Sequence, residues 1–326
     1  MRNHFSYSYS VLMLAAFSVA MVLLGSRYLV ARAQSTPLIR IGTSSNDASA
    51  VVYFAQDAGF FNKAGVRVEI QPDTNGAAVA AAVMSGALDI GVSNVVSIAL
   101  AHAKNLPLVL IAPSAIYSST APTTALLVEK TSPITSGSSL NGKTVAVDGL
   151  NNITQVAADG WIDSHGGDSR TVHFIELPFS EMGSSLQRHI VDAAVIAEPF
   201  LTEAKAGGRI IGYPYDSIGS RFIINGWFAN TEWVAKNQDA VQRFSQALFA
   251  AARWANSHRA QTAPMLVAHS RISPAIVADM TRATYAETLD PSLLQPEIDA
   301  AARYGVLSSR FPARDLLFDA RSHSIR

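Results

Sequence analysis

The sharpest match to a reactive-site motif is a phosphate-binding loop. Residues 137–144 read GSSLNGKT, which fits the P-loop formula G-x-x-x-x-G-K-[ST] at every position. Such a loop holds phosphates only when a strand precedes it and a helix follows, because the helix N-terminus supplies the N–H groups. Turn residues (TSPITS) precede this match, and a Val-Ala-Val strand pattern follows it. We therefore interpret it as a loop that leads into a strand, and not as a nucleotide site.

A second motif, Gly91–Val95 (GVSNV), resembles the nucleophile elbow G-x-S-x-G of hydrolases, but valine replaces the last glycine. The eight histidines form no i, i+4 pair, and the chain contains no cysteine. Zinc-thiolate chemistry and a thiolate nucleophile are thereby excluded. We predict no catalytic residue, no metal site and no cofactor, and therefore no enzyme.

Small polar residues recur where predicted strands end. Ligands of open α/β sheets bind at such edges, because helix N-terminal N–H groups point outward there and short side chains allow close approach. The pattern occurs in both halves of the chain, as a binding cleft between two lobes requires. The candidate ligand-binding residues are Ser44, Ser45, Asn46, Thr74, Asn75, Gly76, Ser93, Asn94, Ser114, Asn151, Asn152, Glu198 and Trp227.

These loops contain no lysine or arginine, so an anionic solute would be held by backbone N–H groups and hydroxyls. Glu198 has two possible roles: it accepts a hydrogen bond from an amine or ring N–H of the solute, or it caps the helix that Pro199 opens. Four aromatic residues also have two possible roles: each stacks on a ring of the solute or packs in the core. They are Tyr53, Tyr117, Trp161 and Trp227.

The elements that position these loops follow an alternating order typical of α/β proteins. Predicted strands at 38–41, 66–70, 88–92 and 106–112 alternate with helices at 49–58, 76–85 and 95–104. The unit recurs in strands 144–147, 172–175, 193–196 and 209–211, with helices at 154–165 and 180–189 and one with Pro199 as its first residue. After Trp233 we expect only helices, at 239–257, 260–268, 274–282, 292–304 and 313–320.

Two similar lobes are the simplest interpretation of this repetition. We assign residues 34–121 and 227–326 to lobe 1 and residues 122–226 to lobe 2, joined near 119–124 and 224–228. A helical tail has no sheet of its own, so we expect it to pack on the first lobe.

The first 33 residues have the features of a secretory signal peptide. Arg2 and His4 precede an apolar run of 14 residues, Val11–Leu24, and Ala31-Arg32-Ala33 supplies the small-x-small cleavage pattern. The run is shorter than the ~20 residues of a membrane span. We expect cleavage between Ala33 and Gln34 and a location in the periplasm. An uncleaved anchor stays open as the alternative, because Arg27 and Arg32 lie near the cleavage point.

Charge excludes several partners. The leader holds three of the 25 basic residues and no acidic one, which leaves 22 basic against 25 acidic side chains in the mature chain. Nothing in that balance indicates binding to nucleic acid or to an anionic membrane. Without cysteine the mature N-terminus cannot carry a lipid, so we expect a freely diffusing monomer.

Three segments resemble a known family: Gln56–Val66 (QDAGFFNKAGV), Ser85–Gly91 (SGALDIG) and Glu198–Phe200 (EPF). They are similar to the nitrate/sulfonate/taurine-type substrate-binding proteins of ABC importers, which include binders of aminopyrimidine thiamine precursors. The resemblance implies the type II periplasmic binding fold: two α/β lobes joined by two crossing segments, with a helical C-terminal tail. It also implies closure around a small solute, with a membrane permease and its ATPase as partners.

The chain departs from the sulfonate and taurine binders because Ala197–Pro199 stands where a Trp-Asp-Pro segment is expected. This departure argues against a sulfonate and favours an amine-bearing or heterocyclic solute. The resemblance as a whole still implies a small organic sulfur- or nitrogen-containing solute of the sulfonate, taurine or nitrate class, with an aminopyrimidine or another aromatic heterocycle as the alternative. A pyrimidine-precursor synthase on the same fold, and a sensor partner that reports a solute to a receptor, are further alternatives.

Overall fold

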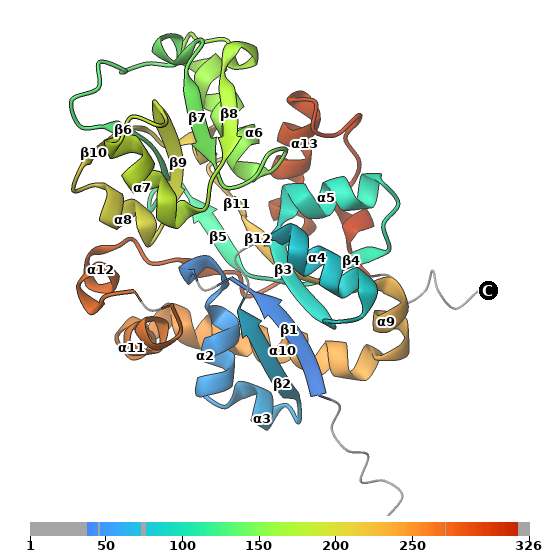
Figure 1. Ribbon diagram of the computed structural model, residues 1–326. Helices are drawn as coiled ribbons and strands as arrows, with labels where there is room; N and C mark the ends of the chain where they lie inside the picture. Colours follow the sequence, from blue (N-terminus) through green and yellow to red (C-terminus); the bar gives the residue numbers. More distant parts are fainter. Residues whose placement is uncertain (1–37, 45, 73–75, 271, 319–326) are drawn as a thin grey trace, which may run out of the picture. The chain divides into compact units, whose positions relative to one another are not determined.

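The computed structural model describes residues 38–44, 46–72, 76–270 and 272–318 (Figure 1). The predicted leader and its cleavage point lie outside these residues, as do the candidate residues Ser45, Thr74 and Asn75. The described chain is mixed α/β, as its alternating pattern predicts. Within these ranges no helix has the length and apolar character needed to cross a bilayer.

Five strands form the first sheet: β1 (Leu38–Thr43), β2 (Arg67–Pro72), β3 (Ile90–Asn94), β4 (Leu108–Pro113) and β12 (Asn225–Asn230). Their order is β2-β1-β3-β12-β4. Strand β1 is parallel to β2 and β3, whereas β12 runs antiparallel to β3 and β4. The carboxyl ends of β1, β3 and β4 and the amino end of β12 therefore meet at one edge of the sheet.

Helices α2 (Val51–Asp57), α3 (Phe60–Lys63), α4 (Gly76–Ser85) and α5 (Val95–Ala103) connect these strands. Helix α4 lies very close to β3 because Gly91 has no side chain. A Cβ there would lie 2.6 Å from Cγ1 of Val79 and 2.7 Å from Cζ of Phe228, which no real contact allows. Glycine at this position thus lets the helix and the sheet approach.

The C-terminal region packs on the first sheet, which confirms the prediction for the tail. Its long helix α10 (Gln238–Ser257) carries Phe244, whose ring stacks on Phe61 at 5.5 Å and meets the edge of Trp227 at 6.2 Å. The other helices of this region are α9 (Thr231–Lys236), α11 (Arg259–Ser270), α12 (Pro274–Asp279) and α13 (Gln295–Arg303).

The second sheet also has five strands: β6 (Thr124–Glu129), β7 (Thr144–Val147), β8 (His173–Glu176), β9 (Ala193–Ala197) and β10 (Gly208–Gly212). Their order is β10-β6-β9-β7-β8, with β7 parallel to β8 and β9. Buried apolar clusters lie on both faces. The connecting helices are α6 (Ile153–Ser164), α7 (Phe179–Gln187) and α8 (Phe200–Ala204). Strand β7 begins at Thr144, the last residue of the P-loop match, as the loop interpretation predicts.

A third sheet has three strands, two of which connect the large sheets along the chain. Strands β5 (Ala115–Ser118), β11 (Arg221–Ile223) and β13 (Thr284–Tyr285) form it, in the order β11-β5-β13. Strand β5 follows β4, and β11 precedes β12, so the chain passes along them from one large sheet to the other. The prediction that strands end after Trp233 is wrong. Strand β13 has two residues and no periodic pattern, and its strand conformation comes from pairing with β5.

Short 3₁₀ helices occur between the larger elements. They are η1 (Asp47–Ser49), η2 (Ser138–Leu140), η3 (Ser169–Thr171), η4 (Pro214–Ser217), η5 (Pro291–Leu293) and η6 (Ala313–Leu316).

Candidate functional site

The loop after β1 carries the candidate residues Ser44 and Asn46, whose side chains form hydrogen bonds within it. Asn46, in an extended conformation, caps η1, because its Oδ1 accepts a hydrogen bond of 3.1 Å from the amide of Ser49. The hydroxyl of Ser44 donates to the hydroxyl of Ser49 at 3.0 Å. The loop is thus closed by its own short polar side chains.

Two residues hold this loop in place: Ser114, directly after β4, and Asn225, at the start of β12. Asn225, the first residue of β12, donates from Nδ2 to Ser49 Oγ at 3.2 Å and accepts from the amide of Ala115 at 3.0 Å. The hydroxyl of Ser114, predicted to face the ligand, donates to the carbonyl of Ala48 at 2.7 Å. Both side chains are buried. The loop is therefore hydrogen-bonded to the two places where the chain leaves the first sheet, after β4, and returns to it, at β12.

Two helix N-termini reach the same edge. Asn94 caps α5 by accepting a hydrogen bond of 2.9 Å from the amide of Ser97. A Cβ on Gly76, the first residue of α4, would lie 3.5 Å from the hydroxyl of Ser93, so the start of that helix lies against β3. The first N–H groups of a helix lack partners within it and carry partial positive charge. This edge therefore favours electron-rich solute atoms without using any side-chain cation.

The corresponding turn of the second sheet follows β7. Asn152 caps α6 and donates from Nδ2 to Asp148 at 2.8 Å, and the hydroxyl of Thr154 donates to the same carboxylate at 2.6 Å. Burial raises the pKa of Asp148. Asn151 is exposed, and its backbone has a positive φ of 56°. Its backbone N–H donates to Oε1 of Gln155 at 2.8 Å.

Glu198 lies at the end of β9 and is only 4% exposed. Its carboxylate accepts hydrogen bonds from the amide (3.0 Å) and the hydroxyl (2.8 Å) of Thr202, and Lys205 Nζ lies 3.7 Å away. Burial raises its pKa, while these partners and the backbone of Thr281 lower it. The capping role is thus present in the structure, and a role in solute binding stays a prediction. The prediction that Pro199 is the first helical residue is wrong: it is the N-cap of α8, after a cis peptide bond.

The aromatic candidates lie inside the protein. Trp227 is fully buried against Phe244, and its Nε1 has no hydrogen-bond partner among the described residues. Tyr117 donates its hydroxyl to Asp216 at 2.8 Å, and Trp161 stacks on His165 at 4.2 Å. In this conformation these rings stabilise the core, and their stacking on a solute stays a prediction.

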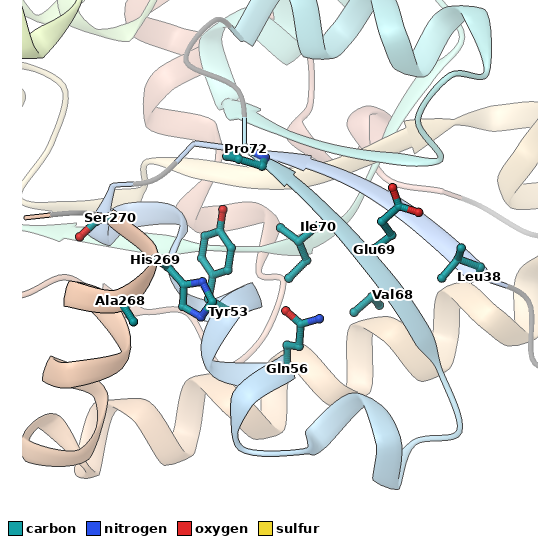
Figure 2. Close-up of a pocket in the computed structure, with 10 residues that line it drawn as sticks. All are labelled: Leu38, Tyr53, Gln56, Val68, Glu69, Ile70, Pro72, Ala268, His269 and Ser270. Carbon is teal, nitrogen blue, oxygen red and sulfur yellow. The ribbon is translucent and has the colours of Figure 1, made fainter.

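A pocket of about 890 Å³ lies along β2, the edge strand of the first sheet (Figure 2). Figure 2 shows the rings of Tyr53 and His269 side by side at one end; their centroids are 4.3 Å apart. His269 also bonds Asp57 at 2.8 Å. Of the residues proposed from the sequence to contact the solute, only Tyr53 lines this pocket, and its ring is stacked on His269. We place the candidate site at the polar edge instead, because capped helix N-termini and buried amides gather there and not along β2.

Three residues that build the site were not predicted from the sequence: Asp47, Ser49 and Asn225. The last is bonded to a residue 176 positions away, which no local pattern reveals. Within the described chain, no three histidine, aspartate or glutamate side chains gather as a metal site requires.

The sequence and the fold were compared with those of known proteins. A family model described as "NMT1/THI5 like" matches residues 46–262. No curated protein matches the sequence.

Many solved structures share the fold. The periplasmic aliphatic sulphonate binding protein SsuA of Escherichia coli is 17% identical with a TM-score of 0.69, over 86% of this chain and 92% of that one. SsuA of Xanthomonas axonopodis pv. citri, bound to MOPS, is 17% identical with a TM-score of 0.71, over 87% and 99%. The periplasmic nitrate-binding protein NrtA of Synechocystis is 13% identical with a TM-score of 0.72, over 86% and 84%. These similarities confirm the predicted periplasmic binding protein fold.

Proposed function

This chain belongs to the NMT1/THI5-like family, and from that premise we propose that it is the extracytoplasmic solute-binding component of an ABC importer. The protein captures a small organic solute between its two five-stranded sheets. A permease and its ATPase in the inner membrane receive the solute. The predicted leader and the periplasmic neighbours support export to the periplasm.

One observation carries the proposal. The capped start of α5, the start of α4 and the loop held by Asn225 meet at one edge of the first sheet. On the second sheet, the turn at Asn152 and Glu198 follow strands β7 and β9. Binding sites of open α/β sheets form at such strand ends.

The chemistry of these groups sets the solute class. Backbone N–H groups, hydroxyls and amides bind the oxygens of a sulfonate or nitrate without a full positive charge. The neighbours named for aliphatic sulphonate and nitrate binding support this class. The buried carboxylate of Glu198 supports the alternative of an amine-bearing solute or heterocycle, because it is a strong acceptor for an N–H donor.

The mechanism contains no chemical step. A solute that contacts both sheets has all its contacts only when they close on it, so binding shifts an equilibrium between open and closed forms. The permease then recognises the closed form.

The test begins with mass spectrometry of small molecules that copurify with the mature protein. A thermal-shift screen of taurine, other alkanesulfonates, nitrate and 4-aminopyrimidine follows, because a bound solute raises the melting temperature by mass action. We expect stoichiometric binding of one class. The variant His269→Ala, in the pocket along β2, is the control and should bind equally well. A flat screen across the panel would reject the proposal.

The enzyme alternative, a pyrimidine-precursor synthase, has less support, because these neighbours are named as binding proteins. Recovery of the bound compound unaltered after incubation separates a binder from an enzyme.

A further inference from the structure

Asp47 is a buried carboxylate next to the candidate site that solute binding does not explain. It is 1% exposed and lies in η1, directly after Asn46. Its partners come from the C-terminal region, more than 230 positions away. Arg282 donates from Nε at 3.1 Å, the amide of Ala283 donates at 2.6 Å, and the hydroxyl of Tyr285 donates at 3.0 Å.

Both sides of this contact exclude water. The side chain of Arg282 is 11% exposed and Tyr285 is 3% exposed. The hydroxyl of Tyr285 also lies 2.7 Å from the carbonyl of Asp47, so this residue is held at its backbone and at its carboxylate. Ion pairs and hydrogen bonds are strongest in such a dry environment, and losing one partner is costly.

The partner segment also touches the second sheet. The backbone of Thr281, directly before Arg282, interacts with the carboxylate of Glu198. Helix α12, which ends shortly before this segment, packs against α8, which Glu198 caps. Residues 281–285 thus join a loop of the first sheet to a strand end of the second.

We propose that Asp47 is a positioning residue for the solute site. It fixes the loop that carries Ser44 and Asn46, and it couples that loop through residues 281–285 to Glu198. The role in solute binding rests on the function proposed above, whereas the coupling is a property of the chain alone. A solute that contacts the loop therefore also changes the surroundings of Glu198 at the second sheet.

Hydrogen–deuterium exchange of Asp47→Asn, without solute, tests the coupling. Asparagine keeps the size of the side chain and removes its charge. We expect exchange faster by on the order of tenfold at the amide of Ser49 and also at the amide of Thr202, which Glu198 holds. Tyr285→Phe removes one hydroxyl and keeps the ring, so it gives the same pattern more weakly and serves if the first variant does not fold.

The matched control is Asp89→Asn. Asp89 is also buried and paired with an arginine of the first sheet, Arg40, at 2.8 Å, but it precedes β3 and lies away from the polar edge. Loss of that pair should leave exchange at Thr202 unchanged. If Asp47→Asn and Tyr285→Phe each change only their own surroundings, or if Asp89→Asn changes Thr202 equally, the coupling is rejected.

Titration with taurine, nitrate and 4-aminopyrimidine tests the role in binding. We expect Asp47→Asn to weaken about tenfold whichever of these the unmodified protein binds, and Asp89→Asn to leave it unchanged. Equal affinity in Asp47→Asn overturns the positioning role while the proposed function stands. If the unmodified protein binds no compound of the full thermal-shift panel, the proposed function fails, and the exchange experiment still decides the coupling.

Discussion

Asn94 and Asn225 are Cα partners in the antiparallel pairing of β3 with β12. Each side chain fixes a different element at the same edge: Asn94 caps α5, and Asn225 holds η1 through Ser49. The start of α5 and η1, which lie 46 positions apart in the chain, are thereby held at the same edge by one pair of neighbouring residues. The edge is thus organised before any solute arrives, which lowers the entropy that binding must overcome.

The first prediction concerns the cap of α5. Asn94→Ala removes the acceptor for the amide of Ser97, which should cost about 1 kcal/mol of stability. If the N-terminus of α5 faces the solute, affinity should also fall about tenfold, which corresponds to about 1.4 kcal/mol. Titration calorimetry and thermal melting measure the two effects separately.

Asn230 offers a matched control at the other end of β12. It caps α9 by accepting a hydrogen bond of 2.9 Å from the amide of Glu232. Asn230→Ala should therefore lose similar stability and keep full affinity. If the two variants lose affinity equally, the cap of α5 has no special place in the site.

How far the sequence predicts this protein depends on how local each signal is. Helix α4 and strand β7 have the predicted bounds, because glycine stops and short apolar runs mark them. Strand β12 (NGWFAN) carries no alternating pattern, and its partners β3 and β4 lie over 100 positions earlier. Its pairing is decided by the tertiary fold, and with it the role of Asn225.

For the site, the sequence singled out Asn46, Asn94 and Asn152 as candidate residues, but not the residues that hold their loops in place. Asn46, Asn94 and Asn152 are recognisable because each side chain bonds an amide two or three positions ahead. Asp47 binds a segment 235 or more positions away, so nothing beside it in the chain indicates its role.

The second prediction concerns Glu198. Glu198→Gln keeps an acceptor for Thr202 and removes the negative charge. Binding of an amine-bearing solute such as 4-aminopyrimidine should weaken about tenfold, because a hydrogen bond to a charged acceptor is worth about 1.5–3 kcal/mol. Binding of nitrate or taurine should not weaken. Calorimetric titration of each compound distinguishes the two solute classes.

Glu203→Gln supplies the comparison for this variant, because Glu203 is exposed on the same helix, α8. It should bind all three compounds as the unmodified protein does. An unchanged affinity in Glu198→Gln for every compound would remove Glu198 from the solute site and leave it as a helix cap.

The third prediction concerns export. The intact mass of protein recovered from the periplasm should correspond to a chain that starts at Gln34. Ala33→Arg should block this processing, because signal peptidase requires a small residue there. Pro37→Ala, outside the small-x-small pattern, should be processed normally. Recovery of the full-length chain from the membrane fraction would favour the uncleaved anchor instead.

The fourth prediction concerns a carboxyl group with no partner. Glu297 on α13 is fully buried, and neither of its carboxylate oxygens has a hydrogen-bond partner among the described residues. Helix α13 packs against both α5 and α6, so this group lies where the two halves of the chain meet. Burial raises the pKa of Glu297 well above its usual value of 4.5. Over a range of pH above 4.5 the folded protein therefore keeps a proton there that the unfolded chain releases.

The sign of the pH effect follows from that difference. Below pH 4.5 both states are protonated, and the group costs no ionisation energy. As pH rises above 4.5, only the unfolded chain ionises, so stability falls until the pH reaches the folded-state pKa. Glu297→Gln removes this term. It should melt like the unmodified protein near pH 4 and higher at pH 7, by about 2–4 °C for each kcal/mol of stability regained.

Thermal melting of both proteins across this pH range checks the prediction, with the exposed Glu287→Gln as the reference that should show no such divergence. Burial also raises the pKa of Asp159 to about 7, but that group is present in both proteins and cancels in the comparison. Equal melting temperatures at pH 7, or a lower one for Glu297→Gln, would show that the carboxyl of Glu297 is charged and solvated in the folded protein. In that case α13 and α6 would not exclude water where they meet.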